Sequence, residues 1–144
     1  MVAIAAPVDV QQIRDGQYIG LESRYLIDAS GALTVDQLLG RADYPWQALQ
    51  KKVLSLGYNR KAVWVQFELA NNGPKSASFI EIEYPVLDNI DFYIQYQDKT
   101  EIYQLGDRAI FKKRPINHRN FVVPVALQRD QSAHVYIRVA SDTS

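Results

Sequence analysis

The sequence contains no cysteine among its 144 residues. That absence excludes a disulfide framework, a thiolate metal site and a cysteine nucleophile, although it leaves the cellular compartment open. Lysine and arginine together number 16, as do aspartate and glutamate, so the formal net charge is zero. A uniformly basic domain that binds nucleic acid is therefore excluded, and we expect no nucleic-acid partner.

Long apolar runs are also missing from the sequence. No apolar stretch approaches the roughly 18 residues that a membrane-spanning helix needs. The N-terminal sequence MVAIAAPVDV lacks a basic region followed by a sufficient apolar run, so it does not resemble a signal peptide. The chain stops at RVASDTS without a closing element. This ending is what we expect of a domain cut from a longer chain, either in nature or in the laboratory.

Tyrosine is abundant, with nine residues, and β-branched residues recur in short runs separated by Asn, Gly, Pro and Asp. This pattern is typical of an all-β domain with many short strands. Residues 62–69 alternate most regularly and put one set of side chains on each face: Val63, Val65, Phe67 and Leu69 against Trp64, Gln66 and Glu68. The same reasoning predicts extended segments over residues 18–28, 79–84, 89–96, 101–105, 121–127 and 134–140.

One short helix is predicted over residues 34–39. Thr34 can cap its first turn, Asp36 favours the positive end of the helix dipole, and Gly40 can end it. Residues 47–55 fit either a second helical turn or an irregular connection.

The alternating strands also predict the architecture. A strand with one apolar face needs a second apolar layer to bury that face. Seven or eight such strands favour an antiparallel two-sheet sandwich in a single domain. A parallel α/β fold is excluded, because no helical patterns of about 10–15 residues lie between the strands.

A series of motifs then runs along the chain in a fixed order. They are the YLID strand end, the TVDQLL helix, a Trp strand leading into Asn-Asn-Gly, LDNIDFYI, Gly106-Asp107, Phe111, the Arg114-Pro115 pair, Arg119, FVVPV and YIRVAS. This order resembles the type-two extracellular domain of the 7TMR-DISM receptors, a periplasmic sensor domain. The resemblance covers residues 18–141, and the spacing L-D-x-I-D-x-Y…G-D-x-x-x-F-x-x-R-P…R-x-F is its most specific part.

The resemblance implies a jelly-roll β-sandwich similar to carbohydrate-binding modules. It implies residues 1–17 as a lead-in, residues 18–141 as the jelly-roll sensor domain, and residues 142–144 as a stub toward the rest of the receptor. It further implies a periplasmic position, ahead of seven transmembrane helices in the inner membrane. The expected partners are a carbohydrate-like small ligand and the receptor's own transmembrane region. A cytoplasmic kinase or cyclase would be the output, and no catalysis or cofactor is expected in this domain.

The polar faces of the strands supply the candidate ligand contacts. Sugar recognition needs an aromatic ring beside planar polar groups. The candidates on the strands are Trp64, Glu81, Glu83, Tyr93 and Arg138, with His118 and Arg119 from the long loop closing one end. The alternative is an ordinary solvated sheet face, in which a loop, a helix or the N-terminal segment covers Trp64.

The loop over residues 106–120 has a structural and a functional interpretation. In the first, Gly106 permits a tight turn, Asp107 pairs with Arg114 or Arg119 or caps amides, and Phe111 anchors the loop in the core. In the second, Arg114, Arg119 and the neighbouring His118 line a site for an anionic or hydroxylated ligand.

Metal binding and catalysis have less support. Asp88 and Asp91, with Glu81 and Glu83, offer oxygen ligands for calcium, but their spacing matches no known loop motif. No nucleophile or zinc motif occurs in the sequence. We therefore predict a binding domain that is not an enzyme. The alternatives are a protein-interaction module, in which the Trp64 face binds another chain or forms a homodimer, and a glycan-cleaving enzyme.

Overall fold

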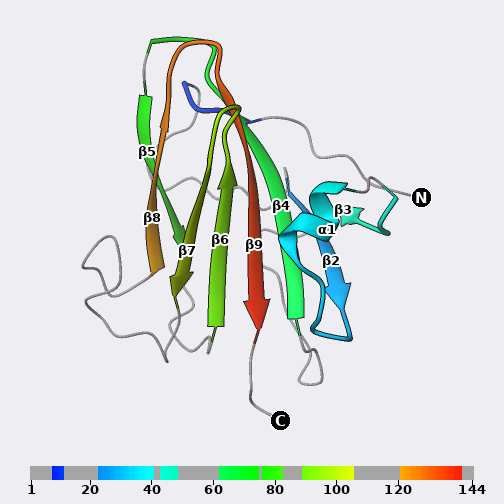
Figure 1. Cartoon of the computed structure of the whole chain (residues 1–144). Coiled ribbons are helices and arrows are strands. Elements are labelled where there is room, and N and C mark those ends of the chain that lie inside the picture. The colour runs from blue at the N-terminus through cyan, green and yellow to red at the C-terminus, as the bar shows by residue number, and fades with distance from the viewer. Residues whose placement is uncertain are drawn as a thin grey trace.

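The computed structural model describes residues 8–11, 23–40, 43–48, 62–74, 76–82, 89–105 and 121–140. Within these residues, strands dominate and the one helix has six residues (Figure 1). The prediction of an all-β domain is therefore confirmed. No helix in this part of the chain has the length and hydropathy to cross a membrane.

Seven of the described strands form the larger sheet. Six run antiparallel in the order β3-β2-β4-β9-β6-β7, and their bounds in that order are Gln47–Ala48, Arg24–Asp28, Ala62–Ala70, Ser132–Ala140, Asn89–Gln95 and Thr100–Leu105. The seventh, β1 (Val8–Asp9), pairs in parallel with the end of β4. This strand lies in the segment that the sequence assigns to a lead-in.

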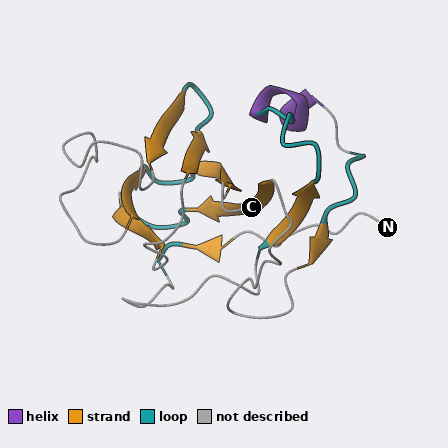
Figure 2. Ribbon diagram, turned by 90° about the horizontal axis from the view of Figure 1, so that it is seen from below, coloured by secondary structure: helices purple, strands orange, loops and turns teal. Residues whose placement is uncertain are grey.

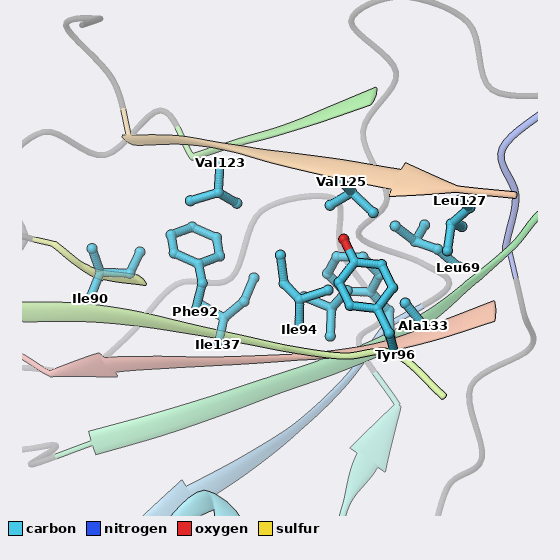
Figure 3. Close-up of a cluster of buried hydrophobic side chains, with 12 residues drawn as sticks. Leu69, Ile90, Phe92, Ile94, Tyr96, Val123, Val125, Leu127, Ala133 and Ile137 are labelled. Carbon is cyan, nitrogen blue, oxygen red and sulfur yellow. The ribbon is translucent and has the colours of Figure 1, made fainter. Parts of the chain in front are cut away.

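A second, two-stranded sheet covers one face of the larger one. It consists of β5 (Ser76–Ile82) and β8 (Phe121–Leu127), which are antiparallel. Figure 3 shows Val123 and Val125 of β8 directed at Phe92, Ile94 and Ile137 of the larger sheet. These side chains belong to the main hydrophobic core.

The alternation read from the sequence is confirmed in this core. On β6, Ile90, Phe92 and Ile94 face the second sheet, and on β9 the residues Val135 and Ile137 do so. Successive side chains in a strand point to opposite faces, so the residues between these positions lie on the other side of the sheet.

That other side carries a second core beneath α1 (Val35–Gly40). Leu26, Leu38, Trp46, Trp64 and Tyr136 are all buried there. Figure 2 shows the helix on one side of the sheet. β4 is therefore buried on both faces. The expectation of an exposed Trp64 is corrected, because the alternative, in which a helix covers this indole, describes the structure.

The helix begins as the sequence predicts. The backbone N–H of Gln37 donates to Thr34 Oγ1 at 3.3 Å, and the N–H of Thr34 donates to Gln37 Oε1 at 2.9 Å. This reciprocal pair is a capping box, which satisfies amides that a helix start leaves unpaired. Gly40 is the last helical residue.

The prediction for residues 47–55 was wrong over its described part. Instead of a helical turn or an irregular connection, Gln47 and Ala48 form a short strand opposite Tyr25 and Arg24. Trp46, the residue before this strand, is anchored by its buried ring. The hydroxyl of Tyr25 donates to Gln47 Oε1 at 2.8 Å. Tertiary contacts thus outweigh the local preference here.

Candidate functional site

Two rows of side chains cross the larger sheet on the face that bears Trp64. The tyrosine row contains, from β7 to β2, the residues Ile102, Tyr93, Tyr136, Gln66 and Arg24. The arginine row lies beside it and contains Gln104, Asp91, Arg138, Trp64 and Leu26. Neighbours within a row are on adjacent strands, whose backbones lie about 4.8 Å apart.

At the end of both rows nearest β2, Leu33, Val35, Leu38, Tyr44 and Trp46 pack in one cluster with Trp64 and Tyr136. We call the described residues from which they come, 29–40 and 43–46, the covering segment. Asp28 fixes the start of this segment. Its carboxylate accepts hydrogen bonds from the N–H of Leu33 at 2.9 Å, the N–H of Ser30 at 3.1 Å and the hydroxyl of Ser30 at 2.6 Å. Burial alone would raise the pKa of Asp28, but these bonds and one from the Gly31 amide outweigh it and hold the pKa below its usual value.

Trp64 occupies the centre of the covered end. It is 0% exposed, and its ring stacks on that of Tyr93 with 5.7 Å between the centroids and 32° between the planes. Its indole Nε1 is buried and has no hydrogen-bond partner among the described residues. An unsatisfied buried donor costs about 1–3 kcal/mol. Native structures hold few such groups, so this one requires an explanation.

Arg138 joins the sheet to the covering segment. Its Nη2 donates to the carbonyl oxygen of Gly31 at 3.1 Å, and its Nη1 lies 3.9 Å from Asp91 Oδ2. Their side chains are 22% and 17% exposed respectively. Burial raises the pKa of Asp91, and the nearby Arg138 opposes that rise. The ion pair is longer than a tight charged hydrogen bond of about 2.8 Å.

Arg24 is the second cation of the face. Its Nε donates to Gln66 Oε1 at 2.7 Å, and its guanidinium lies 4.6 Å from the centre of the Trp46 ring. The rings of Trp46 and Tyr136 are in turn 6.4 Å apart. Burial lowers the pKa of Arg24, while its interaction with Tyr136 acts in the opposite sense. The covered end therefore combines aromatic rings with two arginines.

Toward β7 the same face is more open. Tyr93 is half-buried, Gln104 is exposed, and Ile102 has 55% of its surface exposed. Burial raises the pKa of the Tyr93 hydroxyl, and the carboxylate of Asp91 raises it further. The phenol thus stays protonated and can donate a hydrogen bond. A strip of Trp64, Tyr93 and Ile102 leads from the covered end to the edge strand.

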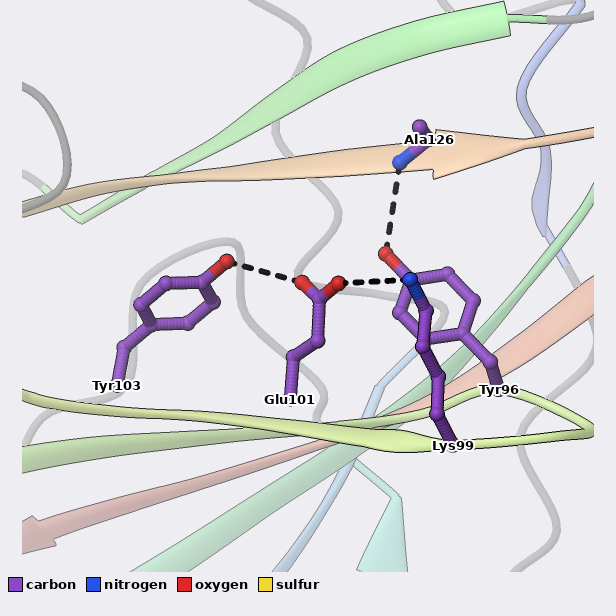
Figure 4. Close-up of polar contacts among 5 residues, drawn as sticks. All are labelled: Tyr96, Lys99, Glu101, Tyr103 and Ala126. Carbon is purple, nitrogen blue, oxygen red and sulfur yellow. Dashed lines mark hydrogen bonds and ion pairs between the residues drawn. The ribbon is translucent and has the colours of Figure 1, made fainter.

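A separate polar cluster lies on the opposite face of the sheet, between the β6–β7 hairpin and β8 (Figure 4). Glu101 accepts a hydrogen bond from Tyr103 Oη at 2.9 Å and pairs with Lys99 Nζ at 3.2 Å. The N–H of Ala126 donates to Tyr96 Oη at 3.4 Å. Burial, together with Glu101, raises the pKa of Tyr103 to about 12. The bond between Ala126 and Tyr96 connects the two sheets, the Glu101 contacts hold the β6–β7 hairpin, and we assign the cluster a structural role.

The structure brings together three of the predicted ligand contacts, Trp64, Tyr93 and Arg138, on one face. Glu81 does not join them, because β5 belongs to the second sheet, across the main core. The remaining predicted residues lie outside the described part of the chain: Glu83, His118 and Arg119 of the ligand set, and Gly106, Asp107, Phe111 and Arg114 of the loop.

The calcium hypothesis has no support from the described residues. Asp91 faces Arg138, Glu81 lies on the other sheet, and Asp88 falls outside the description. Among the residues described, no group of three or more His, Cys, Asp or Glu side chains could hold a metal ion.

Two residues of this face were missed by the sequence analysis, Arg24 and Trp46. Arg24 lies in a strand that alternation describes poorly. Trp46 follows Pro45 in a stretch without periodicity, and an isolated large aromatic in such a stretch was the available signal for a core anchor.

The fold and this face define a β-sheet domain in which aromatic and arginine side chains share one surface. A family model described as 7TMR-DISM extracellular 2 matches residues 20–144, so the chain belongs to that family. It is thus an extracellular sensor domain of a membrane receptor. No curated protein matches the chain.

Proposed function

We propose that this chain is a periplasmic domain of an inner-membrane receptor that binds a carbohydrate-like small ligand and regulates a cytoplasmic kinase or cyclase. Membership of the family supports the receptor role. The proposal includes a jelly-roll sandwich similar to carbohydrate-binding modules, and the packing of β5 and β8 over the larger sheet agrees with it.

The observation that carries ligand binding is the position of Tyr93. Its half-buried ring is stacked on Trp64, while Asp91 and Arg138 lie beside it in the next row. A sugar presents an apolar C–H face to an aromatic ring and pairs of hydroxyls to planar polar groups. Tyr93, with the ion pair at its side, offers both kinds of contact on one surface.

We propose binding without catalysis. Asp91 is the only carboxylate in the tyrosine and arginine rows, and glycoside hydrolysis requires a pair of them. Signalling would follow from a ligand that binds one receptor conformation more tightly than another.

Calorimetric titration of monosaccharides into the chain tests this proposal. We expect Tyr93→Ala to weaken binding by about tenfold or more, as for the loss of an aromatic contact. Tyr25→Ala is the matched control, because it also removes a tyrosine ring but from a position on β2 that belongs to neither row; the Tyr25 hydroxyl contacts Gln47. Equal affinities of the two variants, or no binding of any saccharide, would contradict the proposal.

A protein-interaction module is the second candidate, and one observation favours it. Ile102 is 55% exposed on β7, which is the last strand of the larger sheet in the described order. Exposed edge strands can pair with another chain. Light scattering of the wild type and of Ile102→Thr decides this candidate, because an interface at β7 predicts a dimer for the wild type alone.

A further inference from the structure

Ile102 is the residue of the open end that the proposed ligand site leaves unused. Two large apolar side chains stand exposed among the described residues, and Ile102, with 55% of its surface exposed, is the more exposed of them. The other is Leu39 of α1, at 36%. An exposed apolar side chain on the last described strand of a sheet is a liability, because such strands invite aggregation. The position therefore needs a reason, and we look for it among the neighbours of Ile102 on the sheet.

Ile102 and Tyr93 form the closer kind of cross-strand pair. At the turn of the β6–β7 hairpin, the N–H of Tyr96 donates to the carbonyl of Lys99 at 2.8 Å, so these two residues are a hydrogen-bonded pair. Hydrogen-bonded and non-hydrogen-bonded pairs alternate along antiparallel strands. Three positions from the turn, Tyr93 and Ile102 are therefore a non-hydrogen-bonded pair, with Cα atoms about 4.5 Å apart. The phenol ring and the aliphatic side chain thus share one surface.

Trp64 holds the Tyr93 ring in place from the opposite side. In the sheet order β4-β9-β6-β7, the indole comes from the β4 side of Tyr93, and Ile102 comes from the β7 side. The two rings stack with 5.7 Å between their centroids, and Trp64 is fully buried. A contact surface that is fixed before binding loses less conformational entropy when a ligand arrives. Tyr93 is therefore a preorganised platform, and Ile102 extends it toward the edge of the sheet.

A polar margin lies beside this platform in the arginine row, where Arg138, Asp91 and Gln104 come from β9, β6 and β7. Arg138 and Asp91 are paired with each other at 3.9 Å, and Gln104 is exposed. Asp36 of α1, which also acts on the Tyr93 hydroxyl, adds a negative charge and not a positive one. Because the ion pair is balanced, the margin suits hydroxyl groups, which can donate to the carboxylate and accept from the guanidinium or the amide. It therefore favours a neutral ligand over an anion.

We propose that the open end of this face binds a neutral deoxyhexose of the fucose type, whose ring stacks on Tyr93 and whose methyl group packs on Ile102. The hydroxyls on another edge of the ring then meet the polar margin. This inference rests on the proposed function and narrows its ligand class. An ordinary hexose carries a hydroxymethyl group where the deoxy sugar has its methyl group. Against Ile102, that extra hydroxyl would lose water without gaining a partner.

Calorimetric titration of matched sugars tests the inference. D-fucose with D-galactose, L-fucose with L-galactose, and L-rhamnose with L-mannose are three pairs in which the members differ only by the hydroxyl of the hydroxymethyl group. We expect the deoxy sugar to bind about tenfold more tightly in at least one pair, because it lacks the unpartnered hydroxyl. In nitrogen–proton correlation spectra of the same titration, the amides of Tyr93 and Ile102 should shift.

Ile102→Thr keeps a branched side chain and adds a hydroxyl that can pair with the hydroxymethyl group. It should reduce the preference for the deoxy sugar to about twofold or less. Leu39→Thr is the matched control, because it removes the other exposed apolar side chain from a position on α1 outside both rows, and it should keep the preference. Tyr93→Ala should weaken both sugars of a pair by a similar factor, since both stack on the ring.

The results separate failure of this inference from failure of the proposed function. If the two sugars of every pair bind equally and Tyr93→Ala weakens them, the inference is wrong and the proposed function stands. If no saccharide binds or shifts any amide of β6 or β9, both fail. A deoxy preference that survives in Ile102→Thr overturns the inference, because the methyl group then lies elsewhere. A wild type that is dimeric by light scattering, with Ile102→Thr monomeric, also overturns it, because a second copy then covers Ile102.

Discussion

At the scale of single residues, two buried polar groups differ in their hydrogen bonding within the described part of the chain: the carboxylate of Asp28 is bonded, and the indole N–H of Trp64 is not. Asp28 accepts from Ser30 and Leu33, whereas the Trp64 indole donates to no described residue. Substitution of either residue tests how much its buried polar group contributes to stability.

Trp64→Phe should cost less than about 1 kcal/mol of unfolding free energy. The smaller ring loses buried area, but removal of the unsatisfied donor returns about 1–3 kcal/mol. Trp64→Ala should cost about 3–5 kcal/mol, because it leaves a large cavity. Urea unfolding followed by circular dichroism measures both. Equal costs for the two variants would show that the indole N–H already has a partner.

Asp28 should make stability depend on pH. Its pKa is held below the usual value, so the stabilisation is complete above the unfolded pKa of about 3.9 and is lost as pH falls through the folded pKa. Asp28→Asn should lower stability at pH 7 and flatten the decline below about pH 4. The control is Asp98→Asn in an exposed turn. Parallel acid profiles for wild type and Asp28→Asn would refute this role.

At the scale of elements, Asn71 holds three chain segments together after β4. Its Nδ2 donates to the carbonyls of Pro74 at 2.8 Å and Leu127 at 2.9 Å. Its Oδ1 accepts from the N–H of Gly73 at 3.0 Å and from Gln11 Nε2 at 2.8 Å. All polar atoms of this buried amide are therefore paired.

Asn71→Ala should destabilise the chain by about 2–4 kcal/mol, because the buried bond to the Leu127 carbonyl and three part-buried bonds are lost at once. Asn72→Ala is the matched control: its side chain is exposed and makes one long contact to Asp9, so we expect about 0.5 kcal/mol or less. Thermal and urea unfolding measure the difference. Similar values for the two variants would exclude Asn71 as the link between these segments.

Elements also show what the sequence could predict. The period-two alternation assigned β4, β6 and β9 to their faces, and Thr34 predicted the start of α1, because both signals are local. The burial of Trp64 and the separation of Glu81 could not be predicted. They depend on which segment packs over β4 and on which strands share a sheet. The alternation of side chains within one strand carries no information about either.

At the scale of the whole molecule, the larger sheet separates two environments. One face packs against β5 and β8 in an apolar core, and the other carries the aromatic and arginine side chains beneath the covering segment. The first face explains why the domain folds, and the second face supplies the chemistry for a ligand. The account depends on that second face being the one that binds.

Mapping saccharide-induced amide shifts over the labelled chain tests this claim most directly. We predict that the shifted amides cluster on β6, β9 and the covering segment, around Tyr93, Arg138 and Gly31, together with the Trp64 indole. Shifts that cluster instead around Asp98 and Ser132, at the opposite ends of those strands, with the Trp64 indole unmoved, would contradict it.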